Sequence, residues 1–274
     1  MPSGWTVTAH SATTFHAVDT GQIVHASFQV LAPTPAALFQ TGTLTGKADY
    51  TWPGHTPISV SVDQSVTTTP PVQLTYRTYS SATDAPAAFG QAGNQFGISG
   101  TGADLFSNTD AYSSTYLAGA VTTSSTVDTQ VSSQQNFTGY GKAGIIIRNT
   151  MTAANTTPEG VILFESPSGG VQLEWNSNAG IYIDSVTPAN GTIADTLPVH
   201  LELERTSSAT YTGYYSLDGN GWSKVGTATV PGQADRQDAG IFITSHATGS
   251  PAQATFNGFS AADGAVTAAR TDVL

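Results

Sequence analysis

Polar and aromatic side chains recur at alternate positions of several short apolar stretches in the second half of the chain. Side chains of a β-strand alternate between its two faces, so residues two apart share a face. Planar polar groups can hydrogen-bond sugar hydroxyls, and aromatic rings can stack on sugar C–H patches. We therefore predict a ligand-binding set on one sheet face, made of Arg148, Gln172, Glu174, Tyr182, Glu202 and Tyr214. The alternative is an ordinary solvated face, which also alternates polar residues.

A pair of glutamates raises the question of glycoside hydrolysis. Glu202 and Glu204 are two residues apart on an expected strand, which places their Cα atoms ~6.6 Å apart with side chains pointing the same way. Glycosidases hold two carboxyl groups about 5–9.5 Å apart across the bond they cleave. Alternating glutamates are also common on solvated strands. We predict no catalytic residue in this chain and keep hydrolysis as an alternative.

A loop rich in acidic and amide side chains could hold a metal ion. Asp104, Asn108 and Asp110 offer the hard oxygen ligands that Ca²⁺ prefers, so we predict a structural calcium there. The alternative is that these side chains cap turns. The six histidines show neither His-x-His nor His-Glu-x-x-His spacing, which argues against zinc. We expect no other cofactor.

Composition restricts the partners. The formal net charge is −11, with only eight Lys and Arg residues and no basic cluster, so we predict neither a nucleic-acid nor a membrane partner. Cysteine is absent, which excludes disulfides, thiolate metal sites and a cysteine nucleophile. Charged residues make up 10% of the chain, against about 25% in a typical domain. A hydroxyl-rich surface of this kind is common in secreted carbohydrate-active proteins.

The elements that must position these residues are strands. Apolar residues alternate with period two, and Gly, Pro, Asn and Asp interrupt the pattern at short intervals, which predicts an all-β protein. A Thr/Pro stretch around Pro70 and Pro71 divides the chain, because such a stretch is stiff and extended. We predict an Ig-like sandwich over 1–66, a linker over 67–74, a jelly-roll over 75–266 and a tail over 267–274. The clearest strands are 143–148, 160–165, 170–175, 181–184, 199–204, 211–216, 222–227, 239–245 and 253–259.

Two segments resemble those of a known family. The segments 100–106 (GTGADLF) and 142–148 (KAGIIIR) are similar to the concanavalin A-like lectin/glucanase β-sandwich carried by many secreted bacterial glycoside hydrolases. The resemblance implies that a glycan would sit on the concave outer face of a sheet. It does not extend to the Glu-x-Asp-x-x-Glu strand of the glucanases, which does not occur here.

The first unit resembles the small sandwich domain found beside the catalytic domains of bacterial α-galactosidases and sialidases. The similar pieces are Pro2-Ser-Gly-Trp5, Asp19-Thr-Gly21 and a strand ending in Ala32-Pro33. In that family further strands precede the Pro-x-Gly-Trp segment, so we expect a domain truncated at its N-terminus.

These observations predict a non-catalytic, carbohydrate-binding accessory region of a secreted bacterial glycoside hydrolase. The acidic balance disfavours sulfated or uronic glycans and favours neutral ones. The expected partners are a neutral oligo- or polysaccharide and a covalent neighbouring catalytic domain or a partner chain. A spacer without ligand is one alternative, and a hydrolase that uses a carboxylate pair on the jelly-roll is the other.

Overall fold

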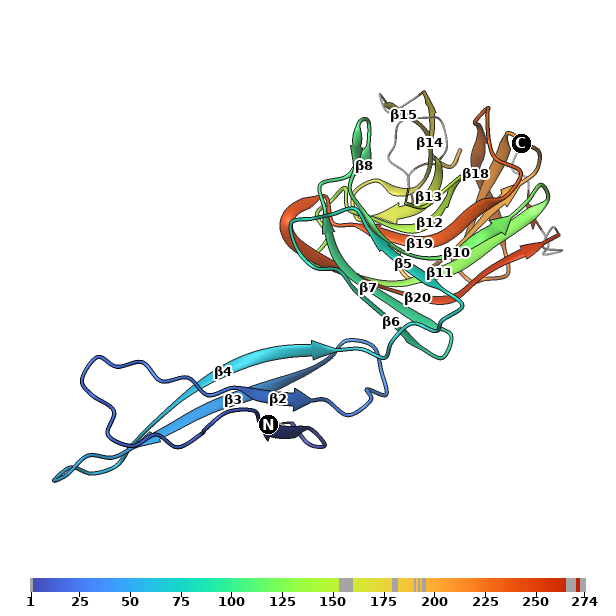
Figure 1. Ribbon diagram of the computed structural model, residues 1–274. Helices are drawn as coiled ribbons and strands as arrows, with labels where there is room; N and C mark the ends of the chain where they lie inside the picture. The colour runs from blue at the N-terminus through green and yellow to red at the C-terminus, as the bar shows by residue number, and fades with distance from the viewer. Residues whose placement is uncertain are drawn as a thin grey trace. The chain divides into compact units, whose positions relative to one another are not determined.

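The computed structural model describes residues 2–152, 160–178, 182–189, 191, 193, 196–264 and 270–271 (Figure 1). For Asn178, Tyr182, Ile183, Arg270 and Thr271 it describes the backbone only. All regular elements of the described chain are strands, so the predicted all-β class is confirmed. The described part contains no helix long and apolar enough to cross a membrane. The chain divides into two units, 1–70 and 71–274, with the boundary between Pro70 and Pro71.

The first unit consists of two separate antiparallel pairs. β1 (Thr6–Ala9) pairs with β2 (Phe28–Leu31), and β3 (Gln40–Tyr50) pairs with β4 (Ile58–Thr68). In the second pair Val60 lies opposite Ala48 and Val62 opposite Gly46, so one face of this ribbon is apolar and the other carries Ser, Thr and charged residues.

The Ig-like sandwich expected for 1–66 is not confirmed. None of the described residues 2–70 is buried, and Val62 on the apolar face of β4 is 71% exposed. Two two-stranded sheets cannot enclose a core at this size. The expected linker also begins too early, because Thr67 and Thr68 still pair with β3.

The second unit is a sandwich of two large sheets, seen stacked in Figure 1. The seven-stranded sheet contains, in spatial order, β15 (Tyr182–Val186), β14 (Gly170–Asn178), β13 (Gly160–Ser166), β12 (Lys142–Arg148), β19 (Gln237–Thr244), β10 (Ser113–Val121) and β5 (Arg77–Ser80). The eight-stranded sheet contains β21 (Arg270–Thr271), β18 (Trp222–Thr229), β17 (Thr210–Ser216), β16 (Val199–Arg205), β11 (Ser125–Gln135), β20 (Ala247–Asp263), β7 (Gln95–Gly102) and β6 (Ala88–Ala92).

The main core lies between these two sheets. Alternate residues of each strand point inward, so Ile145 and Leu163 of one sheet meet Leu201 and Tyr211 of the other, all fully buried. This inward set is made of alternate residues of the strands predicted over 143–148, 199–204 and 211–216. The predicted β-sandwich is therefore confirmed for the second unit.

A second apolar cluster covers part of the outer face of the seven-stranded sheet. Ile146, Ile162 and Phe242 point outward from this sheet, and Leu105 packs against them. Leu105 belongs to a small hairpin made of β8 (Leu105–Phe106) and β9 (Thr109–Asp110), which rises from this side of the sandwich in Figure 1. The hairpin shields one part of the outer face and forms the wall of the site described next.

Candidate functional site

A pocket of about 330 Å³ lies on the outer face of the seven-stranded sheet beside the β8–β9 hairpin. We call it the Glu174 pocket. Its lining combines aromatic rings with charged and amide side chains from five separate segments of the chain. These residues are Asp104, Phe106, Tyr140, Lys142, Phe164, Ser166, Gln172, Glu174 and His246.

Strand pairing explains the floor of the pocket. Phe164 of β13 lies opposite Gln172 of β14 on one side and opposite Gly144 of β12 on the other. A Cβ on Gly144 would lie 2.9 Å from the Phe164 Cβ and 2.1 Å from the Leu163 carbonyl oxygen. Glycine at this position therefore lets Phe164 lie against β12, between the Lys142 and Glu174 side chains that share this face.

An ion pair ties the hairpin to the sheet. Lys142 Nζ lies 2.5 Å from Asp104 Oδ1, and both side chains are largely buried. The same Asp104 oxygen accepts a hydrogen bond from the backbone N–H of Leu105 at 2.7 Å. His246 Nε2 lies 3.5 Å from the other Asp104 oxygen. A lysine can be buried here because a carboxylate compensates its charge.

Glu174 is the least satisfied polar group of the pocket. It is only 5% exposed, and its buried Oε2 has no hydrogen-bond partner. The nearest cation, Lys142 Nζ, is 4.0 Å away. Burial raises the pKa of Glu174 to about 7, Lys142 opposes that rise and Asp104 adds to it. A carboxyl in this state can exchange its proton near neutral pH and can accept a hydrogen bond from a ligand.

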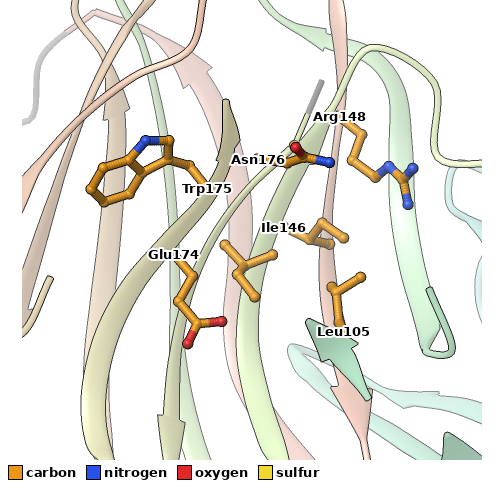
Figure 2. Close-up of a pocket in the computed structure, with 8 residues that line it drawn as sticks. Leu105, Ile146, Arg148, Glu174, Trp175 and Asn176 are labelled. Atoms are coloured by element: carbon orange, nitrogen blue, oxygen red, sulfur yellow. The ribbon is translucent and has the colours of Figure 1, made fainter. Parts of the chain in front are cut away.

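A smaller cavity adjoins Glu174 on the same sheet face (Figure 2). In Figure 2, Asn176 extends from β14 toward Arg148 of β12, Glu174 points along the strand away from Arg148, and the Trp175 ring extends to the opposite side of the strand. The cavity holds about 20 Å³, which is enough for one water molecule.

The rim of the Glu174 pocket is aromatic. Phe106 is 44% exposed and Tyr140 is 64% exposed. The Tyr140 ring lies 5.7 Å from the His246 ring, and Lys142 Nζ lies 5.6 Å from the centre of the Phe106 ring. Exposed rings beside buried polar groups offer a ligand a flat apolar surface together with hydrogen-bonding groups.

Three of the six predicted ligand-binding residues have their side chains on this sheet face. Gln172 and Glu174 line the pocket itself. Arg148 lies on the same face but is buried, with Nη1 2.9 Å from Asp110 Oδ1 and 3.1 Å from the Tyr112 hydroxyl. Its guanidinium holds β9 against the sheet and faces the smaller cavity instead of the pocket.

Two of the other three predicted residues, Glu202 and Tyr214, do not join them. Glu202 and Tyr214 lie opposite each other on β16 and β17 of the eight-stranded sheet, and both are buried. The expectation that all six share one face is wrong, because the alternation of a strand does not say which sheet the strand joins. Tyr182 begins β15 and pairs with Asn178 of β14, but its side chain lies outside the described residues.

Two of the three predicted metal ligands are engaged by cations of the sheet. Asp104 pairs with Lys142, Asp110 pairs with Arg148, and Asn108 lies exposed in the turn of the hairpin. Among the residues that the structure describes, no group of three or more His, Cys, Asp or Glu could hold a metal ion. The calcium site stays a prediction from sequence alone.

Sequence reasoning missed most of the rim of the pocket. Lys142 could have been predicted from the sequence, because the same alternation that directs Ala143 and Ile145 inward directs Lys142 outward with Arg148. Tyr140 stands between two glycines, which marks a turn but not a pocket. His246 joins the pocket from the loop that follows β19, and no local pattern places it beside Asp104.

Comparisons with known proteins concern the fold. No protein-family model matches the sequence, and no curated protein matches it. A functionally unknown protein from Saccharomyces cerevisiae superimposes with a TM-score of 0.51 and 16% identity, over 70% of this chain and 98% of that one. A xylan β-1,4-xylosidase from Bacillus halodurans C-125 superimposes with a TM-score of 0.43 and 17% identity, over 59% of this chain and 32% of that one.

A legume lectin-like domain from Entamoeba histolytica gives a TM-score of 0.43 and 9% identity, over 70% of this chain and 91% of that domain. The similarity to the yeast protein shows that this chain shares its fold, a β-sandwich that spans nearly the whole of that protein.

Proposed function

We propose that this protein binds carbohydrate in the Glu174 pocket. The observation that carries the proposal is the pairing of two exposed aromatic rings, Phe106 and Tyr140, with buried hydrogen-bonding groups in one pocket. Sugars present both C–H patches and hydroxyl groups, and this lining offers a partner for each. The volume of about 330 Å³ is at the low end for ligand pockets, ~300–1,000 Å³, so one end or a short segment of a glycan is the natural occupant.

Each polar group of the pocket has a distinct role in the proposed binding. Gln172 Nε2 donates to the Gly169 carbonyl at 2.8 Å, which fixes the orientation of its amide. Lys142 and Asp104 hold each other and keep Phe106 at the rim. Glu174 supplies an acceptor that has no hydrogen-bond partner in the protein. Tyr140, the most exposed of the lining aromatic residues, supplies the stacking surface.

We also propose a context for this binding, an accessory region of a secreted bacterial glycoside hydrolase. The support is the resemblance of the segments 100–106 and 142–148 to modules of such enzymes. A single shallow site binds weakly, and a neighbouring catalytic domain or further modules would raise the effective affinity through multivalency.

A glycan array probed with the full chain tests the proposal. We expect binding to at least one glycan. The dissociation constant for that glycan should be about tenfold higher in Tyr140→Ala. Tyr50→Ala is the matched control, because Tyr50 is also an exposed tyrosine, at 45%, and belongs to the first unit. A folded protein that binds nothing on the array would leave the spacer without ligand as the better account.

Glycoside hydrolysis is a second candidate, and the structure favours a different carboxyl pair from Glu202 and Glu204. Glu174 and Asp104 both lie within 4.0 Å of Lys142 Nζ. Glu174, with its raised pKa, would protonate the leaving oxygen. The Asp104 carboxylate would take a proton from the water that attacks the anomeric carbon as the glycosidic bond breaks. Release of reducing sugar that disappears in Glu174→Gln would favour this candidate, and binding without turnover would count against it.

A further inference from the structure

When Glu174 is ionised, the charges of the Glu174 pocket do not balance within the protein. Two carboxylates, Asp104 and Glu174, face one lysine. Lys142 Nζ lies 2.5 Å from Asp104 and 4.0 Å from Glu174, so the lysine is committed to Asp104. His246 also lies beside Asp104, at 3.5 Å. Glu174 is left without a close cation on this side.

The smaller cavity does not supply the missing cation. Arg148 borders that cavity together with Glu174, but its guanidinium pairs with Asp110 and the Tyr112 hydroxyl. Glu174 Oε2 therefore remains buried without a hydrogen-bond donor. A buried acceptor of this kind is costly unless a donor arrives with the ligand, and a charged donor satisfies it best.

The rings around the pocket suit a cation as well as a sugar face. Lys142 Nζ already lies 5.6 Å and 5.5 Å from the centres of the Phe106 and Phe164 rings. The negative faces of aromatic rings attract ammonium groups. The net charge of −11 favours the approach of a cationic ligand and opposes an anionic one.

We infer that the glycan carries a free primary amine and that its ammonium donates to Glu174. This inference rests on the proposed carbohydrate binding and names its substrate class, an amino sugar. A neutral hydroxyl would satisfy the hydrogen bond but would not compensate the charge of the ionised carboxylate. An acetamido group would bring a neutral N–H and additional bulk. The neutral glycan expected from composition is thereby replaced by a cationic one.

Proton release accompanies this binding. The charged groups that face Glu174 are Lys142 from β12, Asp104 from the hairpin and, across the smaller cavity, Arg148; His246 lies beyond Asp104. With a pKa of about 7, Glu174 is partly protonated at neutral pH. A bound ammonium stabilises the carboxylate, so Glu174 gives up its proton on binding. Below the pKa of the sugar amine, where the amine already carries its own proton, the proton from Glu174 leaves to the buffer.

Three tetrasaccharides with the same β-1,4-linked glucose backbone test the inference. They differ only at carbon 2, which carries a hydroxyl, an acetamido group or an ammonium. We expect the full chain, titrated calorimetrically at pH 7 and physiological ionic strength, to bind the amino form at least about tenfold more tightly than either other form. At pH 6, where the sugar amine already carries its proton, the heat measured in buffers of different ionisation enthalpy should report proton release for the amino form.

Two variants assign the selectivity. Glu174→Gln keeps the shape of the side chain and removes its charge, so the preference for the amino form and the proton release should both disappear. Asp63→Asn removes the same charge from an exposed position on β4 of the first unit and should change neither. The proton release of the unmodified chain needs no variant and stands as an independent readout.

The outcomes separate this inference from the function on which it rests. Equal binding of the three forms, or a preference for the hydroxyl or acetamido form, overturns the amino sugar but leaves carbohydrate binding in place. The same holds if none of the three binds while other glycans on the array do. A preference that survives in Glu174→Gln overturns the role of Glu174. A blank array removes both proposals.

Discussion

The two units of the chain carry the same alternation of apolar and polar residues, but only the second one buries it. In the first unit the apolar face of the β3–β4 ribbon, with Val60 and Val62, stays exposed. In the second unit Ile145 and Leu163 are fully buried, because a second sheet lies against theirs. Alternation produces an amphipathic sheet, and a core requires a second layer to cover it.

Truncating one apolar side chain in each unit should give the largest difference. Leu163→Ala should lower the free energy of unfolding by about 2–5 kcal/mol, because it opens a cavity in a closed core. Val62→Ala should change it by less than about 0.5 kcal/mol, because the side chain already contacts water. Chemical denaturation measures both. A large cost for Val62→Ala would show that the apolar face of the first unit is covered in solution.

Ion pairs offer a second comparison, with a somewhat smaller effect. Arg148→Met leaves Asp110 without its cation in a largely buried setting, and we expect a loss of about 2–3 kcal/mol of unfolding free energy. Lys47→Met breaks a pair with Asp49 whose side chains are 60% and 64% exposed, and we expect a change of at most about 0.5 kcal/mol. Similar losses of unfolding free energy in the two variants would mean that burial does not make the Arg148–Asp110 pair contribute more than the exposed Lys47–Asp49 pair.

One carboxyl group in each unit should make stability depend on pH, and the two dependences should have opposite sign. Burial raises the pKa of Glu174 from 4.5 to about 7. Between these values the unfolded chain has lost a proton that the folded chain retains, so rising pH lowers stability, by up to about 3 kcal/mol. Hydrogen bonds from Ser59 and Lys47 lower the pKa of Asp49, so its contribution is present above pH 3.8 and is lost as pH falls further.

Unfolding curves measured from pH 3 to pH 8 test this contrast. In Glu174→Gln the loss of stability between about pH 4.5 and 7 should disappear, and the variant should exceed the unmodified chain in stability above pH 7. Asp49→Asn should keep that loss. An unchanged pH profile in Glu174→Gln would mean that Glu174 ionises at its ordinary pKa in the folded protein.

Part of the candidate site was predictable from the sequence. Gln172 and Glu174 belong to a strand whose alternate residues Val171 and Leu173 are apolar, and the structure buries those two in the core. The outward direction of Gln172 and Glu174 follows from this local pattern. The surroundings of Glu174 do not, because Asp104 and Lys142 come from segments far away in the chain and raise or oppose its pKa only once folded together.

The amino-acid sequence by itself indicated most strands of the second unit after residue 142 and which of their side chains face the core, but not β5, β6, β7, β10 or β11. Both are local properties, set by period-two alternation and by turn residues. Only the tertiary structure decided which strands share a sheet. Arg148 and Glu174 therefore lie on one outer face while Glu202 and Tyr214 lie in the other sheet. Strand pairing and layer packing depend on contacts between distant segments, and no local pattern records them.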